Sequence, residues 1–322
     1  MGAFLGWGGR LAVVPRGYLG VEVFFVLTGY FLCQSMSKGN TRILPFLTKK
    51  VKVFYPELLS SLAIALCFRN LVSFLENGEL HSNLTLFAND ALLLKMAGIP
   101  FSPMRGLNDP AWYLSSMMLA TVPLYLYHKF RGADMLLMLA GIALFAGLLW
   151  SVDNISNPYT CVHGVCIGNV RALSAMGIGM CAFPAAAWLR KLTLTHRMQI
   201  VITVVKHLLF LLAFAYMLTW VPNNHLAWLI LVWGWVVLAM CGQSLTTHVF
   251  AHAMFCTLGK ISLPLFLSHH FYAKYWGAIM PSGTPDWQMA TWYLLAAGIT
   301  TAAVMGGALL IRRIAAAFHT PH

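Results

Sequence analysis

The stretch that decides the fold runs from Gly17 to Leu32 and reads GYLGVEVFFVLTGYFL. It holds a single charged residue, Glu22, among apolar, aromatic and small residues. With its neighbours up to residue 34 it approaches the roughly 20 residues that a helix needs to cross a bilayer. A carboxylate inside such a helix costs about 2.5–3.5 kcal/mol unless it is paired or solvated. The stretch predicts a membrane helix in which Glu22 is either buried with a partner or placed near the interface, where the helix dipole favours it.

The composition of the whole chain agrees with a membrane protein. Of 322 residues, 59% are hydrophobic and only 9% are charged, whereas a soluble domain carries about 25% charged residues. Such a chain is not soluble and globular, disordered or fibrous. Its 11 Trp and 11 Tyr residues suit helix ends at a membrane interface.

Apolar stretches of spanning length recur along the chain. We therefore predict an all-α fold, a polytopic transmembrane helix bundle of about nine spans forming a single domain over residues 1–322. A further apolar stretch, 84–98, is interrupted by Asn89, Asp90 and Lys95 and predicts an interfacial or re-entrant helix. The nine predicted spans are 17–34, 54–75, 111–127, 134–151, 165–189, 200–221, 226–241, 259–280 and 288–311.

The cations predict the orientation, because cytoplasmic loops collect Lys and Arg. This rule also explains the formal charge of +12 without nucleic acid, which we exclude as a partner. We predict a multi-pass protein of the inner (cytoplasmic) membrane with a cytoplasmic C-terminus. The cations that alternate onto one side are Lys38, Arg42, Lys49, Lys50, Lys52, Lys129, Arg131, Arg190, Lys191, Arg197, Arg312 and Arg313.

The same count of spans places the N-terminus outside. Residues 1–16 hold no recognisable signal peptide that would carry it there. We therefore expect that one helix is missing before Met1 and that the chain is truncated at its N-terminus.

The seven cysteines show no zinc-like pairing, and we predict no metal site. His248 and His252 have helical i, i+4 spacing but lack a third ligand. Cys161 and Cys166 share one polar loop and can form a disulfide if that loop is extracytoplasmic.

Five segments, in order, resemble the acyltransferase family 3 integral membrane proteins. The resemblance implies ten spans and transfer of an acyl group, usually acetyl, from a cytoplasmic donor such as acetyl-CoA to an extracytoplasmic sugar. The five segments are GYLGVEVFFVLTGY (17–30), FLTKKVKVFYP (46–56), WYLSSMM (112–118), RALSAMGIG (171–179) and LGKISLPLFLSHH (258–270).

Two departures from the family pattern concern the chemistry. The family's first helix ends in a histidine that is taken to be catalytic, and residues 1–16 contain no histidine. The family's basic loop tends to carry Arg-x-x-Arg, where this chain has Lys50-x-x-Val53. Lysine keeps the charge but not the bidentate fork of arginine.

The resemblance implies a catalytic set of Glu22, Arg171, His269 and His270. Arg171 lies inside an apolar span and either snorkels to the outer interface or faces a cavity. His269 and His270 are either packed in the core or act in acid–base chemistry or positioning, and their side chains point about 100° apart on a helix.

Two further groups are candidates for binding. Lys49, Lys50 and Lys52 either hold the donor's phosphates or only set the topology. Trp112 and Tyr113 form either an interfacial aromatic belt or a stacking face for a sugar. No bound cofactor is expected, because acetyl-CoA or another acyl-CoA is the donor substrate.

We therefore predict a membrane O-acetyltransferase that modifies cell-envelope polysaccharide. Its partners are an acyl-CoA, a cell-envelope glycan or glycolipid, and the lipid bilayer. The alternative is a transporter or flippase for a cell-envelope precursor, in which the buried charges line a translocation path.

Overall fold

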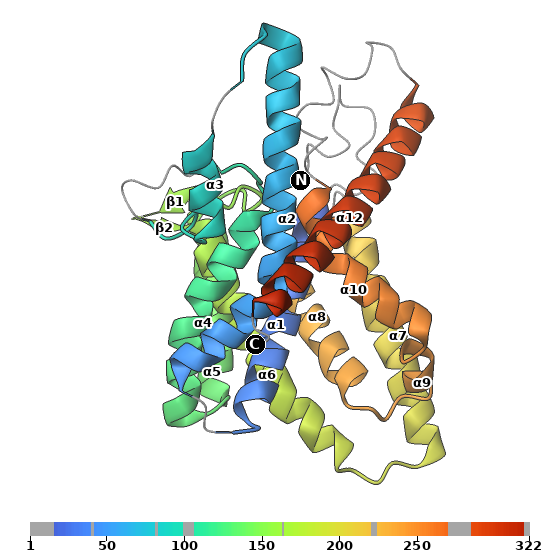
Figure 1. Cartoon of the computed structure of the whole chain (residues 1–322). Coiled ribbons are helices and arrows are strands. Elements are labelled where there is room, and N and C mark those ends of the chain that lie inside the picture. Colours follow the sequence, from blue (N-terminus) through green and yellow to red (C-terminus); the bar gives the residue numbers. More distant parts are fainter. Residues whose placement is uncertain are drawn as a thin grey trace. The chain divides into compact units, whose positions relative to one another are not determined.

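The computed structural model describes residues 16–39, 42–80, 83–98, 106–162, 164–219, 224–269 and 285–318 (Figure 1). Most of these residues are helical, which confirms the predicted all-α fold. The elements are η3 (Gly17–Leu19), α1 (Gly20–Met36), α2 (Ile43–Asn77), α3 (Leu84–Ala91), α4 (Ala111–Arg131), α5 (Met135–Ser151), β1 (Cys161–Val162), β2 (Val165–Cys166), α6 (Ile167–Arg190), α7 (His196–Leu218), α8 (His225–Met240), α9 (Thr247–Phe250), α10 (Ala253–Ser268) and α12 (Asp286–Ala317).

Each of the nine predicted spans overlaps one of these helices. Within the described residues, five helices are long and apolar enough to cross a membrane: η3 with α1, α2, α6, α7 and α12. Three shorter apolar helices, α5, α8 and α10, lie where further spans were predicted. The predicted interfacial stretch 84–98 forms only the two-turn helix α3 and the turns after it.

One prediction about local structure was wrong. The basic stretch with Lys49, Lys50 and Lys52 is not a loop but belongs to α2, which is continuous from Ile43 to Asn77. Its 35 residues extend about 52 Å, well beyond the roughly 30 Å of the hydrocarbon core. The helix is therefore long enough to extend out of the membrane with a polar first section. Lysine is compatible with this section because it is a good helix former.

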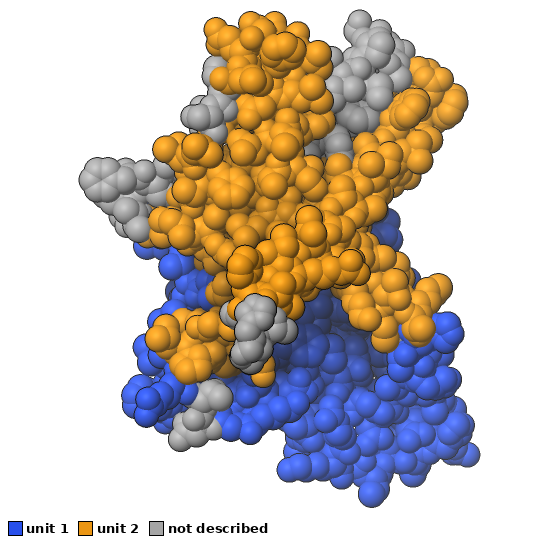
Figure 2. Space-filling view, viewed as in Figure 1, with its two compact units in different colours: residues 1–43, 116–252 blue, residues 44–115, 253–322 orange. Residues whose placement is uncertain are grey.

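The chain divides into two compact units, coloured separately in Figure 2. Unit 1 comprises residues 1–43 and 116–252, and unit 2 comprises residues 44–115 and 253–322. Each unit is described by itself below.

Unit 1 is organised around α6, which packs against α1, α5 and α8. The crossing of α1 and α6 is reciprocal, because a glycine of each helix lies against the backbone of the other. A Cβ at Gly29 would come within 3.0 Å of the Met176 carbonyl, and one at Gly179 would do the same at Val26. Small residues allow membrane helices to approach this closely.

The loop before α6 is closed by a short antiparallel hairpin of β1 and β2. Cys161 and Cys166 face each other across it and are joined by a disulfide, as the sequence allowed. The hairpin leads directly into the first turn of α6.

Unit 2 joins α2, α3, α10 and α12 through polar contacts. The Asn108 backbone N–H donates to the Asp90 carboxylate on α3 (2.9 Å). The Asn108 side chain donates to Ser61 Oγ on α2 (3.2 Å) and to the Leu267 carbonyl on α10 (2.9 Å). Arg312 of α12 forms an ion pair with Glu57 of α2. These contacts tie segments together that are far apart in the sequence.

We predict that Gly29→Ala and Gly179→Ala each destabilise unit 1, because the added methyl group must displace a neighbouring backbone. Overpacking of this kind costs typically about 1–3 kcal/mol. Thermal unfolding of the solubilised protein measures the effect. Gly147→Ala on α5 is the matched control, since a Cβ there meets nothing within 4 Å. Equal stability of all three variants would contradict the close crossing.

Candidate active site

The first polar group in the interior of unit 1 is an ion pair between Glu22 of α1 and Arg171 of α6. Both residues have 0% exposure, and the Arg171 Nε donates to Glu22 Oε1. Both residues are site candidates from the sequence, and the structure brings them together. Arg171 therefore does not snorkel to the interface.

The guanidinium of Arg171 is held in a fixed orientation by two backbone carbonyls as well. Nη1 donates to the Ile155 carbonyl (2.8 Å), and Nη2 donates to the Tyr18 carbonyl (3.1 Å). One side chain thus ties the start of α1 and the loop before the hairpin to α6. A planar guanidinium with several donors suits this task, whereas lysine offers only a point charge.

The second carboxylate oxygen of Glu22 is different from the first. Among the residues that the structure describes, nothing donates a hydrogen bond to Glu22 Oε2, although the atom is buried. Buried polar atoms are normally satisfied, and an exception calls for an explanation such as a ligand or a catalytic role. Oε2 is therefore a buried acceptor to which no described residue donates.

A histidine that sequence analysis did not select lies beside this pair. His225, the first residue of α8, is 3% exposed. Its Nε2 lies 3.1 Å from the Tyr18 hydroxyl, and its Nδ1 lies 3.0 Å from the Tyr216 hydroxyl of α7. The Asn224 backbone N–H also donates to the Tyr216 hydroxyl (2.8 Å). The guanidinium of Arg16 lies 4.4 Å from the centre of the Tyr216 ring.

Tyr18 connects the two groups. Its carbonyl accepts from Arg171 while its hydroxyl contacts His225. Glu22, Arg171 and His225 are thus gathered with two tyrosines, Tyr18 and Tyr216, at one end of unit 1. The topology predicts this end to be extracytoplasmic. The sequence offered no periodic signal for His225, which is one of 12 histidines.

Another buried cation of unit 1 lies on α7. Lys206 is 3% exposed, and its Nζ donates to Ser244 Oγ and Thr246 Oγ1, both at 2.7 Å. Thr203 Oγ1 accepts from the Leu245 N–H (3.0 Å). These bonds hold the segment after α8 against α7, which is a structural task.

The late histidine lies in unit 2. His269 is buried, with Nδ1 2.5 Å from the Phe266 carbonyl, and its own carbonyl accepts from the Tyr293 hydroxyl (2.9 Å). Phe266 also packs edge-on against Tyr113. His270 lies outside the described residues. An acid–base role for either histidine stays a prediction.

The predicted sugar-stacking pair opens α4. Trp112 and Tyr113 are 8% and 6% exposed, so both rings are buried. Just before them, Lys95 forms ion pairs with Asp90 (3.9 Å) and Asp109 (3.6 Å). Burial raises the pKa of Asp90, and the Lys95 ammonium opposes that rise. These ion pairs hold the residues just before α4 in place.

The three predicted donor-binding lysines lie on the first turns of α2. Lys49 and Lys52 are exposed and three residues apart, so they share one helix face. Lys50 is half-buried, with Nζ 5.8 Å from the centre of the Phe46 ring.

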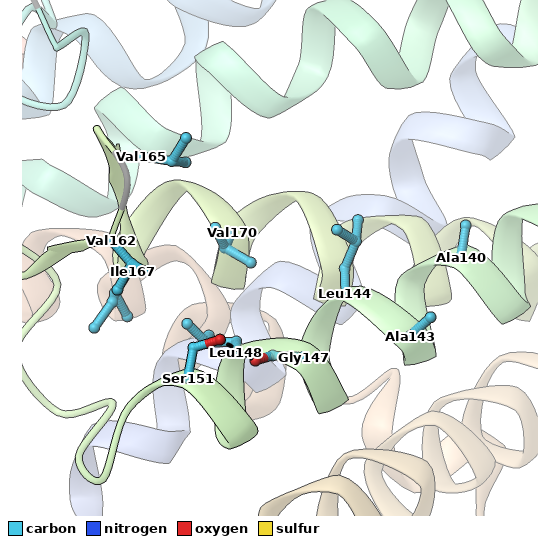
Figure 3. Close-up of a pocket in the computed structure, with 10 residues that line it drawn as sticks. All are labelled: Ala140, Ala143, Leu144, Gly147, Leu148, Ser151, Val162, Val165, Ile167 and Val170. Carbon is cyan, nitrogen blue, oxygen red and sulfur yellow. Dashed lines mark hydrogen bonds between the residues drawn. The ribbon is translucent and has the colours of Figure 1, made fainter.

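A groove of about 550 Å³ lies between α5 and the hairpin with the start of α6 (Figure 3). Ser151 supplies the single polar side chain among its lining residues. The groove therefore brings no acid, base or cation to a ligand. The ten lining residues are Ala140, Ala143, Leu144, Gly147, Leu148, Ser151, Val162, Val165, Ile167 and Val170.

Comparison with known families agrees with the five segments. The family model for acyltransferase family 3, described as an acyltransferase domain, matches residues 2–309. The chain belongs to this family. Searches of curated proteins and of solved structures gave no match. The family and the apolar helices together make this chain a membrane acyltransferase. The match covers most of both units.

We predict that Arg171→Met destabilises the acyltransferase by about 3–5 kcal/mol, because it leaves the Glu22 carboxylate buried and unpaired. The double variant Glu22→Gln/Arg171→Met removes both charges and should recover much of that loss. Chemical unfolding of the solubilised protein measures both.

Arg131→Met is the matched control, since the Arg131–Asp134 ion pair is solvent-exposed and its loss should change stability little. A double variant no more stable than Arg171→Met alone would contradict a buried, mutually neutralising pair.

Proposed function

We propose that this acyltransferase moves an acetyl group from acetyl-CoA, or another acyl group from its acyl-CoA, to a hydroxyl of an extracytoplasmic sugar in the cell envelope. The acceptor is a glycan or a glycolipid, and the protein resides in the inner membrane with its C-terminus in the cytoplasm. The observation that carries the proposal is the buried Glu22–Arg171 pair with its available carboxylate oxygen.

Acyl transfer to an alcohol needs the acceptor to be oriented toward the thioester carbonyl. Glu22 Oε2 is suited to accept a hydrogen bond from one hydroxyl of a sugar, because Arg171 pairs with Oε1 and holds the carboxylate in one orientation. Charge-assisted hydrogen bonds of this kind are stronger than neutral ones. A sugar has neighbouring hydroxyls, so holding one of them orients the next.

The donor carries phosphates, and cations at the predicted cytoplasmic end of α2 fit them. Lys49 and Lys52 present two exposed ammonium groups on one helix face. Lys50 adds charge beside them. These lysines are suited to attract a polyanion by charge. They are less suited to recognise one phosphate geometry, because lysine lacks the bidentate fork of arginine.

We expect Glu22→Gln to lower transfer of labelled acetate to cell-envelope polysaccharide, in cells lacking their own enzyme, by about 10-fold or more. One charge-assisted hydrogen bond contributes about 1.5–3 kcal/mol, and 1.4 kcal/mol corresponds to a tenfold change. Protein level and membrane insertion are measured in parallel. A chain that moves a lipid-linked precursor across the membrane but transfers no acetate would favour the flippase alternative.

Charge reversal at Lys49 and Lys52 to Glu should weaken acetyl-CoA binding to the protein in lipid nanodiscs. The loss of affinity should be larger at low salt, where the charges are less screened. Reversal of the exposed Lys191, predicted on the same side of the membrane, is the control and should leave binding unchanged. Unchanged affinity in the α2 variant would leave these lysines with a topological role alone.

A further inference from the structure

The apolar groove between α5 and the hairpin with the start of α6 plays no part in the site described above (Figure 3). We propose that this groove holds one hydrocarbon chain of a glycolipid in the outer leaflet, and that the glycolipid is the acceptor of the acyl group. The inference rests on the proposed acyl transfer, and it selects the glycolipid over the free glycan as the acceptor.

The groove follows one face of α5. Its helix residues recur at intervals of three or four, which places them on one side of the helix. Three of them, Ala140, Ala143 and Gly147, are small and leave the space that larger side chains would fill. From Ala140 to Ser151 the helix rises about 16 Å, about half of the roughly 30 Å of the hydrocarbon core. The groove therefore has about the length of one leaflet.

The predicted topology places the groove in the outer leaflet. Ser151 is the last residue of α5, at the end that is predicted to be extracytoplasmic. The hairpin at this end carries the Cys161–Cys166 disulfide, and disulfides persist in oxidising compartments outside the cytoplasm. Trp150 beside it is 93% exposed, as suits an aromatic residue at a membrane interface. The proposed acceptor is presented on the same side of the membrane.

The lining favours a hydrocarbon chain as the occupant. Apart from Ser151 all lining side chains are apolar, so a sugar or a phosphate in the groove would leave its polar groups without partners. The hairpin residues Val162 and Val165 line the outer end. A membrane-spanning helix packed along α5 would have to continue past this hairpin, whereas a lipid chain ends there in its head group.

The residues at the outer end favour a sugar head group over an anionic one. From Ser151 to Val170 the sequence holds no lysine or arginine, and it holds one acid, the exposed Asp153. An anionic head group therefore finds neither cation type in this segment and meets a carboxylate. Asn154 and Asn157 are exposed as well, and their side-chain amides are donors that suit sugar hydroxyls.

The groove would position the head group rather than extract the lipid from the membrane. Lipid chains are as apolar as the lining, so the hydrophobic effect adds little, and the groove contributes packing and orientation. The loop after Ser151 supplies the Ile155 carbonyl that accepts from Arg171 (2.8 Å). On α6, Val170 of the lining directly precedes Arg171. A head group at the outer end therefore lies beside the loop that Arg171 holds.

The first experiment measures binding without any acyl transfer. The full chain is placed in phosphatidylcholine nanodiscs with a small share of a monoglucosyl diacylglycerol that carries a diazirine in one acyl chain. Labelled peptides are identified after illumination, and we expect the label on α5 and the hairpin. In Gly147→Trp the Cβ meets nothing within 4 Å, so the indole has room to enter the groove. This variant should lower the label by about tenfold, which corresponds to about 1.4 kcal/mol.

Gly298→Trp on α12 is the matched control, because its Cβ also meets nothing within 4 Å and Gly298 lies in another predicted span. It should keep the wild-type label on α5. Label spread evenly over the lipid-facing helices, or undiminished in Gly147→Trp, would overturn the proposal. Equally strong labelling of the groove by a diazirine phosphatidylglycerol would overturn it too, as would α5 crosslinking to α5 of a second copy.

A second experiment separates the groove from the proposed function. Transfer of labelled acetate is compared between envelope glycolipids and the same glycans after their lipid is removed. Gly147→Trp should lower kcat/KM for the glycolipids by about tenfold and leave transfer to the free glycans unchanged. Equal kcat/KM changes with both acceptors would overturn the acceptor assignment. A wild-type chain that is labelled in the groove but acetylates neither acceptor would instead overturn the proposed function.

Discussion

The buried ion pair between Glu22 and Arg171 is the interaction on which the rest of unit 1 depends. Neither charge is tolerable alone in an apolar interior, so the two helices that carry them must stay together. Gly29 and Gly179 allow that approach over the length of the crossing. The α1–α6 pair is therefore held by the Glu22–Arg171 ion pair at one end and by close backbone packing further along the helices.

The same pair explains why the candidate site lies where it does. Arg171 also binds the Tyr18 and Ile155 carbonyls, so it fixes the segment before α1 and the loop before the hairpin. Tyr18 in turn contacts His225, and through it α7 and α8 are drawn into the cluster. The site is assembled from five segments, namely η3 with α1, the loop before the hairpin, α6, α7 and α8. The Arg171 guanidinium on α6 binds the first two directly. Preorganisation of this kind is what acyl transfer requires of a protein.

Much of the fold could be predicted from the sequence, because apolar runs of spanning length are a strong signal. The nine predicted spans all overlap helices. The cost of isolated charges indicated that Glu22 and Arg171 each need a partner or a place at the interface, but it did not pair them. The cations around Lys49 predict a cytoplasmic loop, but the stretch belongs to α2, whose 35 residues are longer than a membrane span requires. The apolar pattern over 84–98 also did not predict that α3 ends at Ala91.

His225 shows where sequence reasoning ends. A single histidine at a helix start carries no spacing signal, and its importance comes from Tyr18 and Tyr216, which are 207 and nine residues away in the sequence. Only the folded chain brings these three together. Trp112 and Tyr113 illustrate the reverse case, because an aromatic pair at a helix start suggested an interface, yet both rings are buried.

The most direct test of the account is a double-mutant cycle on acetyl transfer, with Glu22→Gln, Arg171→Met and both together, normalised to folded protein. If Arg171 acts by holding the Glu22 carboxylate, the second substitution should cost little once the first is made, and the losses should be strongly non-additive. Losses that simply add would mean that the two residues act independently, and would contradict a site built on their pairing.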